Sequence, residues 1–147
     1  MVSNVIGQGK SEEVLPLIRR IVILSLSCSA FLTIVLNLGP EIFLSFFGQD
    51  ASFITDAIPV IRVVSVALIM MSFSAVWLNS VTGTGNTLVN LTIESITITG
   101  YLIYVYLVLE IWNLPITWGW VSEWVYWAGM FSMSFWYMRS ERWRKKG

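Results

Sequence analysis

The sequence of 147 residues contains no histidine and a single cysteine, Cys28. An intramolecular disulfide needs two cysteines, and the usual zinc sites need several Cys or His ligands, so both are excluded. The net charge is zero and no basic stripe with interleaved aromatic residues occurs, so nothing indicates nucleic-acid binding. No nucleophile–base pair or carboxylate dyad can be found. We therefore expect no metal site, no cofactor and no enzymatic activity.

Charged residues are also scarce, at 12% of the sequence against 56% apolar residues, whereas an average soluble domain is about 25% charged. The few charges leave long gaps, between Arg20 and Glu41, between Arg62 and Glu94, and between Glu94 and Glu110. Apolar runs of this length are typical of membrane-spanning helices. We predict an all-α integral membrane protein whose first partner is the lipid bilayer.

Four transmembrane helices are predicted, over residues 17–39, 57–82, 87–111 and 116–138. At 1.5 Å per residue, each of these segments of roughly 23 to 26 residues can cross a hydrocarbon core about 30 Å thick. Strands of a membrane barrel would alternate between apolar and polar residues, and these runs do not. The spans together form one transmembrane region, residues 17–138.

The flanking segments predict the orientation. Eight of the nine basic residues lie toward the chain ends: Lys10 precedes the first span, Arg19 and Arg20 lie at its start, and five form the basic tail 139–147. The positive-inside rule therefore places both termini in the cytoplasm, with the protein in the cell (inner) membrane. The acidic segment 41–56 becomes an outer loop, and Arg62 is expected to snorkel or to pair with Asp56. Residues 1–16 read as a cytoplasmic loop that follows a helix missing from the chain.

Polar residues within the spans are the candidates for function. Six of them recur at steps of three and four in the third span and share one helical face: Thr87, Asn90, Glu94, Thr97, Tyr101 and Tyr104. A second polar face, with Thr92, Ser95, Thr99 and Tyr106, suggests that this helix packs inside a bundle. Glu94 has two interpretations. It is either a proton or cation site, or a carboxylate that caps the cytoplasmic end of the hairpin.

The first and second spans carry polar stripes of their own. The first has Ser25, Ser29, Thr33 and Asn37 at four-residue steps, and the second has Arg62, Ser65, Ser72 and Asn79. Small polar residues either allow close helix packing or line a substrate path, and packing is favoured. The candidate substrate and ion pathway residues are Glu94, Asn90, Thr97, Tyr101, Ser72, Asn79 and Arg62.

Several motifs resemble a known family in both order and spacing. They are Asn4-Val-Ile-Gly-Gln-Gly-Lys10 before Arg19-Arg20, the turn Ser80-Val-Thr-Gly-Thr-Gly-Asn-Thr87, the segment Phe46-Phe-Gly-Gln-Asp50 with Asp56 and Arg62, and the ending from Ser122-Glu-Trp124 to Arg142-Trp-Arg144. Together they resemble the multidrug and toxic compound extrusion (MATE) transporters. The resemblance implies a fold of twelve helices in two six-helix lobes, of which this chain would supply helices nine to twelve, with residues 1–10 ending helix eight.

The resemblance also implies a function. It predicts the C-terminal part of a secondary antiporter that exports small organic, often cationic, compounds in exchange for Na⁺ or H⁺. Its partners would be the remaining helices of the transporter, and the chain alone would not transport. The second span has no acid between Arg62 and Glu94, where some branches carry a coupling carboxylate, so coupling residues are not transferred. A lipid-linked polysaccharide flippase of similar fold and a small four-helix membrane scaffold or subunit are the alternatives.

Overall fold

The computed structural model describes residues 1–46 and 51–146, and every element in these ranges is helical. The long helices are α2 (Val14–Leu38), α4 (Ala51–Gly83), α5 (Thr87–Tyr106) and α7 (Ser122–Arg139). Shorter helices are α1 (Val2–Gly7), α3 (Pro40–Ser45) and α6 (Ile116–Trp120), together with 3₁₀ turns at Ser11–Glu13 and Arg142–Lys146 and a π-helical turn at Leu107–Ile111. The prediction of an all-α protein is confirmed.

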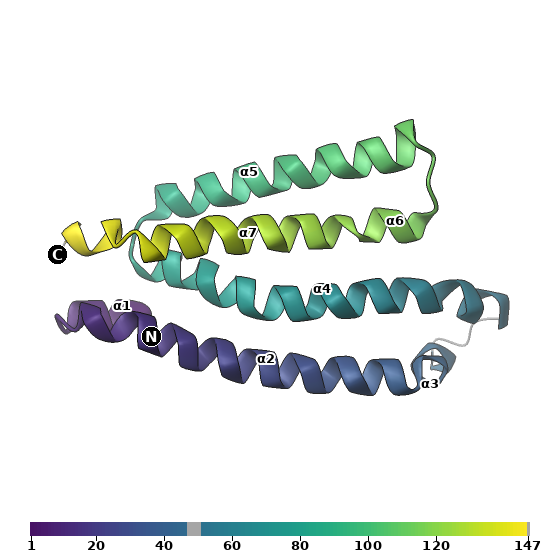
Figure 1. The fold of residues 1–147 in the computed structure, drawn as a ribbon, viewed down its shortest axis with the longest axis horizontal. Coiled ribbons are helices and arrows are strands. Elements are labelled where there is room, and N and C mark those ends of the chain that lie inside the picture. The colour runs from purple at the N-terminus through teal and green to yellow at the C-terminus, as the bar shows by residue number, and fades with distance from the viewer. Residues whose placement is uncertain (47–50, 147) are drawn as a thin grey trace.

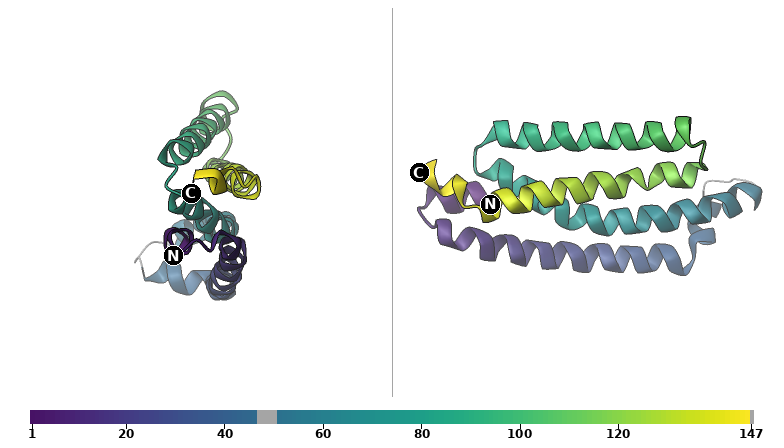
Figure 2. Two further views of the ribbon diagram at one scale, coloured as in Figure 1. Left: turned by 90° about the vertical axis from the view of Figure 1, so that its left-hand side faces the viewer. Right: turned by 45° about the horizontal axis from the view of Figure 1, so that its top comes forward.

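The long helices form a gently curved row in the order α2, α4, α7, α5 (Figure 1). Helix α7 packs against both α4 and α5, so the hairpin partners α4 and α5 contact each other chiefly near their connecting turn. Both chain termini lie at the same end of the row (Figure 2). An even number of crossings produces this arrangement.

Three helical segments are long and apolar enough to cross a membrane: Ser11–Leu38, Ser52–Gly83 and Thr87–Ile111. Large apolar side chains on them are exposed, among them Leu24 at 66% and Leu102 at 59%. Such a surface is suited to contact with lipid rather than with water. The prediction of an integral membrane protein is therefore confirmed. The predicted fourth span corresponds to α6 and α7, which are separated at Val121, and its many Trp, Tyr and Ser residues make it less hydrophobic.

The segment 41–56 was predicted to be an outer loop, but two helices, α3 and the start of α4, extend into it. Pro40 starts α3 because a proline fits the first turn of a helix, where its missing N–H is not needed. Helix α4 already begins at Ala51, six residues before the predicted start at 57, because the apolar residues Phe53 and Ile54 continue the helical pattern. Residues 47–50 of the family-like motif lie outside the described ranges.

The expectation that α5 is enclosed within a bundle is wrong for this chain. Helix α5 lies at the edge of the row and packs mainly against α7. Its second polar face is therefore exposed, and the hydroxyls of Thr92 and Thr99 donate only to carbonyls of their own helix, Leu88 O at 2.8 Å and Ser95 O at 2.7 Å.

Candidate functional site

The turn between α4 and α5 places the candidate residues of α5. Gly85 has a φ of +77°, a conformation that favours glycine, and Asn86 caps α5 through a hydrogen bond from Val89 N to its Oδ1 at 3.4 Å. The Asn86 Nδ2 also donates to the hydroxyl of Tyr137 on α7 at 3.1 Å. The start of α5 is therefore held against the end of α7.

A chain of hydrogen bonds leads from this turn to Glu94. Thr82 Oγ1, near the end of α4, donates to Asn90 Oδ1 at 2.9 Å, and Asn90 Nδ2 donates to Glu94 Oε1 at 2.9 Å. Glu94 is half-buried, and no described residue donates to its second oxygen, Oε2. One oxygen is thus fixed by the protein, while the other has capacity to accept a proton or to contact a cation.

The same face of α5 continues along α7. We call this contact the α5–α7 seam; it comprises Glu94, Thr97 and Tyr101 of α5 and Glu123, Tyr126 and Met130 of α7. Thr97 is buried, and its hydroxyl donates to Ile93 O at 2.8 Å rather than to the Glu94 side chain. Gly129 permits the close contact here, since a Cβ at that position would lie 3.0 Å from Thr97 Cγ2.

A small cavity opens farther along the seam. Tyr101 and Tyr126 meet edge to face with their ring centroids 6.1 Å apart, and with Ile98 and Glu123 they line a space of about 200 Å³. Glu123 accepts a hydrogen bond from Trp127 Nε1 at 3.1 Å. Tyr126 lies within electrostatic range of both Glu94 and Glu123. The seam therefore combines two carboxylates, two phenols and a cavity.

Glu123 did not stand out in the sequence as a site residue, because it lies among tryptophans at the predicted membrane interface. Only the antiparallel packing of α7 on α5 brings it beside Tyr101. The sequence did contain a signal for this residue: Glu123 is a second acid, and it lies on the helix that follows the polar third span.

The remaining candidates lie away from the seam. The Ser72 hydroxyl accepts a hydrogen bond from Ser29 Oγ at 3.0 Å, and the Ser72 carbonyl accepts one from Ser25 Oγ at 2.9 Å. Ser72 therefore lies in the contact between α2 and α4, which favours the packing interpretation. Whether it also lines a path stays a prediction.

Arg62 is exposed on α4, and among the described residues it forms no ion pair with Asp56. The two residues lie six positions apart on one helix, about 9 Å along its axis, and such positions do not share a face. The alternative of an Arg62–Asp56 pair is therefore not realised.

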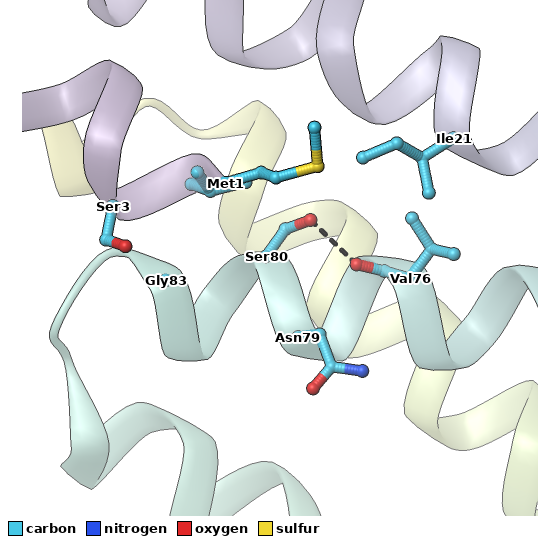
Figure 3. Close-up of a pocket in the computed structure, with 8 residues that line it drawn as sticks. Met1, Ser3, Ile21, Val76, Asn79, Ser80 and Gly83 are labelled. Carbon is cyan, nitrogen blue, oxygen red and sulfur yellow. Dashed lines mark hydrogen bonds between the residues drawn. The ribbon is translucent and has the colours of Figure 1, made fainter.

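Asn79 is exposed near the end of α4 and borders a separate cavity of about 230 Å³ between α1, α2 and α4 (Figure 3). Its Nδ2 donates to Ala75 O of its own helix at 2.8 Å, and its side chain points away from Met1 (Figure 3). Gly83 closes this cavity, since a Cβ there would lie 2.8 Å from Val2 Cβ. Asn79 and the seam thus belong to different places in the fold.

These features define a class of protein. Long apolar helices with exposed lipid-facing side chains carry a polar seam, and the described residues contain no cluster that could hold a metal ion. They describe a multi-pass membrane protein. The family model MatE matches residues 1–108, and the chain belongs to this family. No curated protein and no solved structure matches the chain.

The matched residues include all seven predicted site residues, from Arg62 to Tyr101. Helix α7, with Glu123 and Tyr126, lies outside the matched part. The half of the seam on α5 thus lies in the matched part of the chain, and the half on α7 lies outside it.

Proposed function

We propose that this chain forms part of one lobe of a secondary antiporter that exports small organic, often cationic, compounds in exchange for Na⁺ or H⁺. In this proposal the lobes rock against each other around a central site. Family membership supports transport in general. The observation that supports ion coupling is the half-buried Glu94, with one oxygen held by Asn90 and the other without a donor among the described residues.

Glu94 is the proposed coupling site. A carboxylate inside a span costs several kcal/mol unless it is neutral or paired, and no basic residue pairs with it in the described part of the chain. Binding of a proton or a cation would remove that cost. Transport of an organic cation in the other direction would then be linked to occupancy of the same carboxylate.

The proposed orientation has both termini in the cytoplasm. It is supported by the location of the N- and C-termini, with most of the basic residues, at one end of the row. The exposed polar face of α5 supports a role in a cavity wall, because Thr92, Ser95 and Thr99 face no other described helix.

The main test replaces Glu94 by Gln in the intact transporter. Gln keeps an oxygen for the bond from Asn90 but cannot titrate, so we expect efflux to fall roughly tenfold or more and to lose its pH dependence, with membrane insertion unchanged. Glu94→Asp should retain part of the activity. Glu110→Gln is the matched control, since Glu110 is exposed at the far end of the same hairpin arm.

The rival interpretation makes Glu94 a structural group of the hairpin that connects Thr82 to α5. It predicts that Glu94→Gln lowers stability slightly and leaves the pH profile of efflux unchanged. Superimposable profiles at equal protein level would therefore exclude the coupling role. A separate measurement tests the need for the other helices: liposomes with this chain alone should show no ion-driven efflux of a cationic dye above empty controls.

A further inference from the structure

A groove outside the α5–α7 seam lies at the end of the row that holds both termini. It has a volume of about 500 Å³ and lies between three helices. Helix α2 contributes Leu15, Arg19 and Val22, α4 contributes Trp77, and α7 contributes Phe135 and Arg139. We call it the basic groove.

The basic groove combines two cationic groups with an apolar floor. Leu15, Arg19 and Val22 are spaced by four and three residues and so share one face of α2. Arg139 lies one turn after Phe135, with its guanidinium carbon 5.8 Å from the centre of the Phe135 ring. Trp77 packs against Phe135 with the ring centroids 4.9 Å apart. A ligand here would meet guanidinium groups at one side and aromatic rings at the other.

The acidic residue that borders the groove, Glu141, already forms an ion pair with another arginine. Glu141 borders the groove, and its Oε2 lies 3.1 Å from Arg144 Nη1. Within the described ranges, neither Arg19 nor Arg139 forms an ion pair. The basic groove therefore presents uncompensated positive charge, and the group that complements it carries negative charge.

The depth of the groove indicates where that anion would lie. Arg19 is five residues into α2 and Arg139 is the last residue of α7, so both lie within about 8 Å of a helix end. Arginines at this depth extend toward the headgroup level of a bilayer while their stems cover apolar surface. The aromatic floor lies on the side of the hydrocarbon core.

We propose that the basic groove binds an anionic phospholipid. The lipid phosphate would lie between Arg19 and Arg139, because guanidinium groups form strong, charge-assisted hydrogen bonds with phosphate oxygens. The upper part of an acyl chain would pack on Trp77 and Phe135. Basic pockets between transmembrane helices on the cytoplasmic side are suited to such headgroups.

The test uses the full chain, purified in a neutral detergent, with native mass spectrometry as the readout. Phosphatidylglycerol and phosphatidylcholine with identical acyl chains are titrated in parallel. We expect a clear preference for phosphatidylglycerol. Arg19→Gln and Arg139→Gln should each weaken its binding about fivefold, and the double variant roughly 25-fold. Arg19→Lys should retain most of the affinity, since it keeps the charge.

Arg20→Gln is the matched control, because Arg20 is the next residue of α2 and does not line the groove. Equal losses for Arg19→Gln and Arg20→Gln would overturn the proposal, since they would show a general effect of charge. Displacement of the lipid by millimolar inorganic phosphate would also overturn it, in favour of a soluble-anion site. If a variant loses its helical circular dichroism spectrum, the test rests on the wild-type chain alone. Equal binding of phosphatidylglycerol and phosphatidylcholine to the wild-type chain would then exclude the proposal.

Discussion

Helix α4 has two sides, and it uses different chemistry on each. Toward α2 it forms side-chain hydrogen bonds, from Ser29 Oγ to Ser72 Oγ at 3.0 Å and from Asn37 Nδ2 to Ser65 Oγ at 2.8 Å. Toward α7 it packs rings, with Phe73 and Trp77 meeting Phe131 and Phe135 at centroid distances from 4.9 to 6.4 Å. One helix thus has a polar interface and an aromatic interface.

The difference between the two interfaces of α4 can be explained by the lipid bilayer that surrounds the helices. Within a bilayer, lipid tails are as apolar as the side chains, so helices associate through van der Waals packing and hydrogen bonds rather than through the hydrophobic effect. Small hydroxyl residues let α2 approach α4 closely, and each bond adds little. Large rings fill more space against α7. We therefore expect the aromatic interface to contribute more stability than the polar one.

The largest expected effect comes from Phe131→Leu. Phe131 contacts Phe73, Trp77 and Phe135, and ring pairs contribute about 0.5–1.5 kcal/mol each. We expect the free energy of unfolding to fall by about 2 kcal/mol, as measured by circular dichroism during titration of micelles with SDS. Phe31→Leu is the control, because Phe31 on α2 is 66% exposed. Equal losses for both variants would refute the stronger role of the aromatic interface.

A smaller effect is expected from Trp124→Phe. This residue supplies one of two hydrogen bonds that cross the aromatic interface: its Nε1 donates to Val63 O of α4 at 2.9 Å, and the Ser74 hydroxyl of α4 donates to Trp127 O at 3.0 Å. Phe keeps most of the ring and removes the donor, so the loss should be about 1 kcal/mol. The same unfolding titration measures it. Trp136→Phe, at a site that is 74% exposed, should change nothing, and a loss there of similar size would contradict the assignment.

The amino-acid pattern predicted the long helices and the polar stripes, because both depend on local periodicity, but it did not predict the start of α4 at Ala51 or the separation of α6 from α7. Ser29 and Asn37 recur at helical spacing, and the structure pairs them with Ser72 and Ser65. The order of the helices in space was not accessible, since nothing local indicates that α7 lies between α4 and α5. For that reason the sequence placed Glu94 on a polar face but could not show that this face meets α7, or that Glu123 and Tyr126 complete the seam.

The smallest expected effect tests the polar interface itself. A double-mutant cycle with Ser29→Ala and Ser72→Ala isolates the hydroxyl–hydroxyl bond, because the second bond to this site, from Ser25 Oγ, goes to the Ser72 backbone carbonyl and survives both changes. Hydrogen bonds between membrane helices average about 0.6 kcal/mol in such cycles, and we expect a coupling of about that size in the SDS titration. Ser27→Ala provides the baseline, since the Ser27 hydroxyl is exposed and bonds only to Ile23 O of its own helix. A coupling of zero would mean that α2 is held to α4 by close packing alone. A coupling near the loss expected for Phe131→Leu would instead mean that the two interfaces of α4 contribute equally to the free energy of unfolding, because one hydroxyl pair would then contribute as much as a cluster of rings.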